Sequence, residues 1–510
     1  MSIKSILDIK AQGAWNGGTR VDNSMFENKG LSFKGDIPVT DQAIQDRVGV
    51  RYRMAAPEDE RIGMSALQDL IETTDLDLSR IKVVIGATNV GEDKYDPGPA
   101  IQYSFELLKS HCPHAFVFDL YAGCPGFNLG VELIYMLSQT GVLNQGDLSI
   151  IIGAENLHRA KAFRPDDTGN IIFGDDALAT ALETKASLKP SGDYADRSTG
   201  RIQLGEDVIT GLAETILELT GGEGIDGILI DNQLGKAEYR IPATAARVQH
   251  RMVELQYPGE AKKKTLTRFK DALAFFDEHV DSFAFDIMSL NHGPDLVKLL
   301  ARSYVESGKY GSVVSAYLSP DLTVEVCLHE GKGCILVKPE LGIIDTRTRT
   351  HGCFADYIMG ELEDGDIFGI MDGKGVFLYA TRGANTILAP LLAENDLTWD
   401  DIDLLIEHQA NFAMIPLTLQ QVLPAKKGDL KDVVSRFLAE HMVMNIHERG
   451  NCSVVCMQRL PYDLNRGALA PDIVQGFEIN MNLDRLQDAR TIIFDSVGAG
   501  MTRSSFIRKL

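Results

Sequence analysis

The chain has 510 residues, of which 44% are hydrophobic, and this is enough for a sizeable core and more than one structural unit. Its formal net charge of −22 disfavours nonspecific binding to nucleic acid or to an anionic membrane. No apolar run approaches the ~20 residues of a membrane helix, and the first residues lack the apolar core of a signal peptide. We therefore expect a soluble, cytoplasmic protein with no nucleic-acid and no membrane partner.

Apolar strand-like runs alternate with helix-like periods along most of the chain. This rhythm predicts an α/β protein with buried sheets. The strand-like runs are IKVVIGAT (81–88), HAFVFDLYA (114–122), LSIIIGAE (148–155), IDGILIDN (225–232), SFAFDIMSL (282–290), GSVVSAYLS (311–319), IDLLIEHQ (402–409) and RTIIFDSVGAG (490–500).

The stretch YAGCPGFNLG (121–130) places a cysteine at a predicted strand-to-helix turn. The flanking glycines permit a tight turn, and Pro125 suits the first turn of a helix. Backbone N–H groups and the helix dipole are expected to lower the pKa of the Cys124 thiol there. From these residues alone, a nucleophile and a buried structural cysteine are about equally supported.

The other cysteines carry no such signal. Their number is odd and no Cys-x-x-Cys pair occurs, which argues against a disulfide framework or a structural zinc site. We expect them to be buried thiols that behave as small hydrophobic residues, and we expect no metal. They are Cys112, Cys327, Cys334, Cys353, Cys452 and Cys456.

Two segments of the chain resemble each other. Residues 114–141 align without gaps on 281–308, so that Asp119 falls on Asp286 and Cys124 falls on Asn291. Weaker likenesses join 81–91 to 225–235 and 171–183 to 327–339. We interpret this as a degenerate internal copy of one βα unit over about 200–339, without a nucleophile. The alternative is that any two β-α-β segments look alike.

Two stretches in the last quarter of the chain hold further polar candidates. IEHQANFAMI (406–415) follows an apolar strand and leads from His408 into a predicted helix. ERGNCSVVCMQRLPYDL (448–464) places Asn451 in a turn before another helical period. Each residue taken alone is more typical of a structural histidine or an ordinary loop.

Together these motifs resemble the β-ketoacyl-acyl-carrier-protein synthase III family of the thiolase superfamily. That family has an A-C-S-G-F-like turn, then H-Q-A-N and then G-N-T-S, and this chain has AGCPGF, HQAN and GNCS in the same order. The segments 44–60, 170–179, 341–352 and 495–505 fit the family pattern as well. The resemblance covers about 1–185 and 338–510.

The resemblance implies a five-layer αβαβα sandwich of two similar halves. We expect a first half at 1–185 that carries the nucleophile and a second half at 340–510 that carries the histidine and the asparagine. Residues 186–339 are then an insertion that a plain synthase III lacks. A homodimer is the family expectation, and no cofactor is expected.

The resemblance also assigns the site residues. Cys124 is expected to hold the acyl group, while His408 and Asn451 donate hydrogen bonds to an enolate oxygen. The backbone N–H of Cys124 and one from the loop Gly498-Ala499-Gly500 are expected to hold the tetrahedral oxyanion. Arg47 matches the arginine of the segment where substrate enters.

Some positions depart from the family pattern. The family's tryptophan in the substrate-entrance segment falls on Ala43, which weakens the case for a coenzyme A primer and favours a carrier-protein-bound one. Glu92, Asp93 and Tyr95 stand where the family places a loop near the neighbouring protomer's pocket, and a carboxylate there is a minor candidate for a base in non-decarboxylative condensation or cyclisation. Charged residues 257–271 predict a solvated segment, with docking of an acidic partner as the minority interpretation.

The sequence therefore predicts an enzyme that acts on acyl thioesters of an acyl carrier protein or coenzyme A. The leading hypothesis is a Claisen condensation through an acyl-cysteine, in fatty-acid or polyketide biosynthesis. Three alternatives stay open: an acyltransferase to an oxygen or nitrogen nucleophile, a ketosynthase/cyclase that joins two β-keto acyl chains, and a non-catalytic partner subunit.

Overall fold

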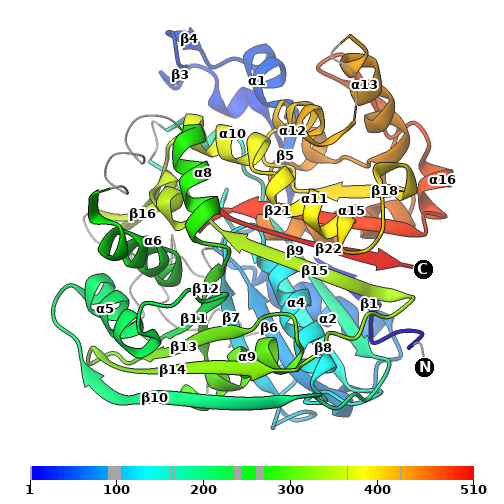
Figure 1. Ribbon diagram of the computed structural model, residues 1–510. Coiled ribbons are helices and arrows are strands. Elements are labelled where there is room, and N and C mark those ends of the chain that lie inside the picture. Colours follow the sequence, from blue (N-terminus) through cyan, green and yellow to red (C-terminus); the bar gives the residue numbers. More distant parts are fainter. Residues whose placement is uncertain are drawn as a thin grey trace.

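Two large β-sheets, with helices between and around them, form the body of the molecule (Figure 1). The computed structural model describes residues 3–89, 105–160, 163–164, 167–234, 243–259, 269–290, 292–363, 366–424 and 428–510. None of the helices in this described part combines the length and the apolar character that a bilayer span needs.

The larger sheet has ten strands and takes them from both the first 185 residues and the segment 186–339. Six of the eight apolar runs that the sequence marks as strands become its buried central strands, as expected for a sheet covered on both faces. Its order is β1 (Leu7–Ala14), β9 (Asp176–Thr184), β8 (Leu148–Glu155), β6 (Ile81–Ala87), β7 (Phe116–Tyr121), β12 (Phe283–Ser289), β11 (Gly227–Asn232), β13 (Ser312–Leu318), β14 (Thr323–Lys332) and β10 (Asp193–Gln203).

The smaller sheet belongs to the last part of the chain. It has four strands in the order β15 (Gly342–Thr350), β22 (Thr502–Lys509), β21 (Thr491–Gly498) and β18 (Leu404–Glu407). β18 and β21 run parallel, and the other neighbours are antiparallel. His408 directly follows β18, so the end of this strand fixes the backbone position of His408.

Helix α4 (Gly126–Gln139) lies between the two sheets, and every one of its residues is buried. It contacts β6, β7 and β8 of the larger sheet and β15, β21 and β22 of the smaller one. Two more helices, α9 (Pro294–Glu306) and α15 (Cys456–Asn465), share the largest hydrophobic cluster with it. Because α4 begins right after Cys124, its burial on all sides holds the cysteine at the centre of the molecule.

The outer faces of both sheets are covered by further helices, which completes five layers. The larger sheet packs against α2 (Ile62–Thr73), α5 (Val208–Thr220) and α6 (Thr244–Gln256). Residues of the smaller sheet share a hydrophobic cluster with α11 (Asn385–Ala393), α12 (Met414–Val422) and α13 (Leu430–His441). This arrangement confirms the αβαβα sandwich that the sequence predicts.

Shorter elements complete the described chain. The remaining helices are α1 (Asp41–Val48), α8 (Phe269–His279), α10 (Gly373–Arg382), α14 (Ile446–Arg449) and α16 (Leu483–Gln487). Paired short strands are β2 (Thr19–Asp22) with β5 (Tyr52–Ala55), β3 (Ser32–Phe33) with β4 (Ile37–Pro38), β16 (Ile358–Glu363) with β17 (Asp366–Met371), and β19 (Asp472–Val474) with β20 (Phe477–Ile479).

Candidate active site

Cys124 lies in the turn between β7 and α4, partly exposed, as the sequence predicts. Gly123 before it has a φ of 67°, a left-handed conformation that favours glycine. A Cβ atom on Gly123 would lie 2.5 Å from the backbone nitrogen of Ala499. The cysteine turn and the loop 498–500 therefore touch through positions where only glycine fits.

The acidity of the Cys124 thiol differs from the sequence-based prediction. Burial raises the pKa of Cys124 to about 12, and nearby Glu155 raises it further, while a hydrogen bond from Ser453 opposes the rise. The prediction of a lowered pKa is therefore wrong, because the cost of burying a charge outweighs the helix N-terminus here. The resting group is a thiol rather than a thiolate.

Ser453 links the cysteine to the asparagine turn. Its hydroxyl donates to Cys124 Sγ at 3.3 Å, and its backbone N–H donates to Asn451 Oδ1 at 2.8 Å. The serine is fully buried and has a φ of 48°, which is uncommon for a residue with a side chain. A strained backbone that aims a hydroxyl at a reactive sulfur is typical of functional sites.

Asn451 is held by the backbone on both sides. Its N–H donates to Ile172 O at 2.8 Å, and its carbonyl accepts from Gly174 N at 3.2 Å. The side-chain Nδ2 donates to Ala410 O at 3.5 Å, two residues after His408. The G-N-C-S turn therefore lies against both the cysteine turn and the H-Q-A-N stretch.

His408 is buried and neutral. Burial, aided by the positive charge of Arg503, lowers the pKa of His408 to about 3. Its Nδ1 lies 3.1 Å from the sulfur of Cys456, the first residue of α15. Burial raises the pKa of Cys456, so that residue carries a proton that it can donate to Nδ1. The tautomer of the imidazole decides which group donates in this contact: a thiol that donates to Nδ1 goes with hydrogen on Nε2.

A buried carboxyl lies behind the cysteine turn. Asn89 donates from Nδ2 to Glu155 Oε1 at 2.5 Å and to Ser453 Oγ at 2.7 Å. Burial raises the pKa of Glu155 to about 8, so at neutral pH this group is largely uncharged. Glu155, Asn89 and Ser453 thus form one hydrogen-bonded chain that ends at the Cys124 sulfur.

The loop 498–500 packs directly over the cysteine turn, as the sequence predicts for an oxyanion-binding loop. A Cβ on Gly498 would lie 2.5 Å from Cys124 N and 3.0 Å from Cys124 Cβ. Ala499 is buried, and Gly500 has a φ of 77°. The backbone N–H groups of this loop and of Cys124 are therefore close enough to serve one bound oxygen atom.

Arg47 lies apart from this group. It is exposed on α1, with its guanidinium 5.1 Å from the ring centre of Phe33. Among the minor candidates, Glu92, Asp93, Tyr95 and Asn291 lie outside the described residues, as does most of the charged segment 257–271.

Four residues of the site were missed by sequence reasoning: Asn89, Ser453, Cys456 and Glu155. Ser453 follows Asn451 by two positions, so the turn motif itself could have suggested it. Cys456 begins a helix and Glu155 ends an apolar strand, and nothing in their neighbours distinguishes them from core residues. Their roles come from contacts across the fold.

Two groups of side chains in the described part of the chain have the composition of a metal site. Asp196, Cys327 and His329 come close, yet the two imidazole nitrogens of His329 already bond Asp196 at 2.6 Å and Ser315 at 2.8 Å. In the other group, Asp472 and Glu448 are paired with arginines. The imidazole of the first group is satisfied without an ion, whereas in the second group the buried Nδ1 of His447 has no hydrogen-bond partner among the described residues.

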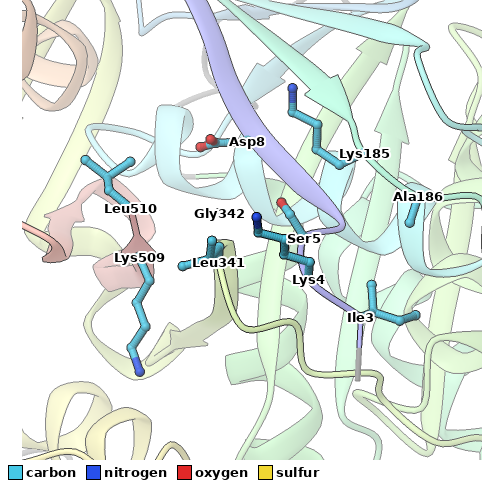
Figure 2. A pocket seen from close by; sticks show the side chains of 10 residues that line it. All are labelled: Ile3, Lys4, Ser5, Asp8, Lys185, Ala186, Leu341, Gly342, Lys509 and Leu510. Carbon is cyan, nitrogen blue, oxygen red and sulfur yellow. The ribbon is translucent and has the colours of Figure 1, made fainter. Parts of the chain in front are cut away.

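A surface pocket of about 520 Å³ lies where the first and last strands meet (Figure 2). Lys4, Lys185 and Lys509 line it, but their ammonium groups point in three different directions. None of the residues around Cys124 lines this pocket. It is a groove between chain ends and not part of the candidate site.

The chain has relatives of known name. It is 30% identical over 213 residues to the β-ketoacyl-[acyl-carrier-protein] synthase III of Paracoccus denitrificans, which is 41% of this chain and 58% of that protein. It is 31% identical over 185 residues to the protein of the same name from Brucella anthropi, which is 35% of this chain and 53% of that protein. The chain thus spans about half the length of these relatives, and no protein-family model matches it.

Solved structures share the fold over the whole chain. A β-ketoacyl-[acyl carrier protein] synthase III of Thermus thermophilus matches with a TM-score of 0.52 and 17% identity, covering 99% of each chain. OleA of Xanthomonas campestris matches with a TM-score of 0.53 and 10% identity, covering 100% of each chain. The thiolase-like fold is therefore common to this chain and to these proteins.

Proposed function

We propose that this chain, a thiolase-fold protein similar to β-ketoacyl-[acyl-carrier-protein] synthase III, is an acyl-thioester condensing enzyme that works through an acyl-Cys124 intermediate. One observation carries the proposal. Cys124, Asn451 and the segment that begins at His408 come from distant parts of the chain and meet in one network of contacts. A nucleophile and two hydrogen-bond donors are what this reaction requires.

In the first step, the Cys124 sulfur attacks the carbonyl carbon of an acyl thioester. The new S–C bond replaces the bond between the acyl carbon and the carrier sulfur, and the departing carrier thiolate takes up the thiol proton. The hydroxyl of Ser453 stabilises negative charge on the Cys124 sulfur as that proton leaves. The tetrahedral oxyanion is bound by backbone N–H groups of Cys124 and of the loop 498–500.

In the second step, a malonyl-type thioester loses CO₂ and leaves an enolate. The electron pair of the broken C–C bond moves into the enolate, whose oxygen accepts hydrogen bonds from His408 Nε2 and Asn451 Nδ2. His408 is well suited to this role because it is neutral and because a Cys456 thiol that donates to Nδ1 goes with hydrogen on Nε2.

In the third step, the enolate carbon attacks the acyl-cysteine carbonyl. A C–C bond forms, the C–S bond to Cys124 breaks, and the thiolate regains a proton. The product is a β-keto acyl thioester on the second carrier. The names of the relatives, β-ketoacyl-[acyl-carrier-protein] synthase III, support an acyl thioester carried by acyl carrier protein. Coenzyme A as the carrier, and a role in fatty-acid or polyketide biosynthesis, rest on the resemblance of the sequence motifs.

Intact-mass measurement tests the first step. The wild-type protein is incubated with acyl thioesters of acyl carrier protein and of coenzyme A in a range of chain lengths. We expect one added acyl group, and we expect none on Cys124→Ala. Because all seven cysteines are free, Cys334→Ala, which removes another partly exposed thiol, is the matched control and should acylate normally.

Addition of a malonyl thioester to the acylated protein tests the later steps. Loss of the acyl adduct with release of CO₂ and a β-keto thioester supports condensation. Transfer of the acyl group to an added amine or alcohol without CO₂ release indicates an acyltransferase instead. If no thioester in the range acylates Cys124, the proposed function is wrong.

A further inference from the structure

The ten-stranded sheet has the same strand arrangement outward from its middle in both directions. From β7 the order is β6, β8, β9 and β1, and from β12 it is β11, β13, β14 and β10. On both sides the successive pairings are parallel, parallel, antiparallel and antiparallel. The two central strands, β7 and β12, pair antiparallel. The sheet therefore has an approximate twofold axis through its centre.

The register at the centre agrees with the internal sequence likeness. When 114–141 is aligned on 281–308, Leu120 corresponds to Ile287. In the structure, Leu120 is the direct partner of Ile287 across the sheet. A residue that pairs with its own equivalent lies on the symmetry axis, so sequence and geometry place the axis at the same point.

The helices follow the same symmetry. α4 leaves the end of β7 and α9 leaves the end of β12, and the two helices contact each other on the inner face of the sheet. α2 precedes β6 as α5 precedes β11, and both cover the outer face. The sequence alignment and the structure disagree at the strand that follows these helices. In the sheet, β14 (Thr323–Lys332) takes the position equivalent to β9, whereas the sequence alignment matches 171–183, which contains most of β9, with 327–339.

We infer that residues 193–332 are a copy of the first half that lacks the cysteine at the Cys124 position and that lies, within the same chain, where a second copy of the first half would lie across the approximate twofold axis. β7 has β6 on one side and β12 on the other, so its edge is already paired and offers no position to a second molecule. The sequence has asparagine where a second nucleophile would stand. One chain of 56.0 kDa therefore holds one site and needs no second copy to complete it.

The copy also supports the loop over Cys124. Gln249 on α6 accepts from Gly352 N at 2.9 Å and donates to Ser282 Oγ at 2.8 Å. The residue before Gly352 donates its N–H to Met501 O, at the end of the loop 498–501. On the same helix, Ala246 lies 3.4 Å from where a Cβ of Gly500 would be. The copy thus braces the backbone that packs on Cys124.

Sedimentation and hydrogen exchange test the place of the copy, and neither needs substrate. We expect a 56.0-kDa species over about two orders of magnitude of concentration, with the amides of β7 equally protected throughout. A dimer through another face would leave that protection unchanged on dilution and also supports the assignment. A dimer whose dissociation removes protection from β7 would overturn it, whether or not Cys124 accepts acyl groups.

The bracing contact is tested with Gln249→Ala. We expect faster hydrogen exchange in 495–505 and alkylation of Cys124 by iodoacetamide that changes by roughly threefold or more. Gln256→Ala, a change of the same type at the exposed end of α6, is the matched control and should leave both measurements unchanged. Wild-type exchange and alkylation in a folded Gln249→Ala protein would show that the copy does not support the loop.

Discussion

Two small side chains near Cys124 show how contacts across the fold set the chemistry of single residues. Ser453 donates to the Cys124 sulfur from a left-handed backbone position, and Cys456 approaches His408 from the start of α15. Both come from the stretch 448–464, so one segment of sequence contacts the Cys124 sulfur and the His408 imidazole together. A change in the backbone of this segment is therefore expected to affect both groups at once.

Cys456 is predicted to matter for condensation more than for acylation. In Cys456→Ala the imidazole of His408 loses its partner at Nδ1 and can take either tautomer, so enolate stabilisation falls. We expect condensation to slow by about tenfold or more, with self-acylation of Cys124 within roughly twofold of wild type. The two rates are measured separately by product formation and by intact mass.

Two further variants control this experiment. Cys456→Ser keeps a donor at the same position and should recover much of the condensation rate. Cys112→Ala removes a buried thiol that bonds Leu108 O instead and should leave both rates unchanged. Equal loss of acylation and condensation in Cys456→Ala would contradict a role through His408.

At the residue scale, the sequence predicts that Cys124, His408 and Asn451 stand at turns or strand ends, as the structure shows, and it predicts the pKa of Cys124 in the wrong direction. The motifs are local, so a single chain shows them. The pKa of Cys124 depends on how many groups enclose it, and enclosure comes from α4, the loop 498–500 and the 451–453 turn at once. A helix N-terminus is visible in sequence, whereas the competing desolvation is not.

At the scale of an element, the loop 498–500 likewise combines a feature that is visible in the sequence with a contact that only the fold decides. Its glycines mark a close approach of two backbones, and the partner is the turn formed by Gly123 and Cys124. The strand β21 delivers the loop from the smaller sheet, while β7 and α4 deliver the cysteine from the larger one. The site therefore depends on how the two sheets are spaced.

Gly498→Ala is predicted to damage the site without left-handed strain, because the φ of Gly498 is −162°. The added Cβ would lie 2.5 Å from Cys124 N, and backbone atoms cannot move aside cheaply. We expect acylation of Cys124 to fall by roughly tenfold or more, measured by intact mass. Gly373→Ala, at the start of α10 with no atom within 4 Å, is the matched control. Normal acylation in Gly498→Ala would rule out the close packing described.

Strand positions are largely predictable from the apolar runs, and the partners of each strand are not. The run 282–290 contains β12, but no local pattern says that β12 pairs with β7 rather than forming a sheet of its own. β10 (Asp193–Gln203) is mostly exposed and has no continuous apolar run, so sequence reasoning left it without a strand assignment. Long-range pairing is decided by the whole sheet.

At the scale of the whole molecule, Glu132 lies where the three parts of the chain meet. It extends from α4, accepts from Thr348 Oγ1 of the smaller sheet at 2.5 Å, and lies 3.4 Å from the hydroxyl of Tyr310 in the inserted segment. Burial raises the pKa of Glu132 to about 7. The folded protein thus keeps a proton there that the unfolded chain, with an ordinary glutamate, would already have released.

This predicts a stability that depends on pH in a known direction. The contribution of Glu132 is fully present below the glutamate pKa of 4.5 and is lost as the pH rises through about 7. Glu132→Gln removes the ionisation, so its melting temperature relative to wild type should be higher at pH 8 than at pH 5, by roughly 2–5 °C. Differential scanning calorimetry at both pH values measures this.

A surface substitution provides the control. Glu214→Gln, on the exposed face of α5, should change the melting temperature equally at the two pH values. If the melting temperature of Glu132→Gln differs from that of wild type by the same amount at pH 5 and at pH 8, the Glu132 carboxyl does not titrate between these two pH values.

The ten-stranded sheet has approximate twofold symmetry, but only one of its two halves carries a cysteine at the Cys124 position, and this has a consequence for binding. A symmetric oligomer presents equivalent sites whose affinities can be coupled, and coupling appears as a sigmoidal or biphasic titration. A molecule with one site has no second affinity to couple. Its substrate saturation should therefore be hyperbolic at every protein concentration at which the chain is a monomer.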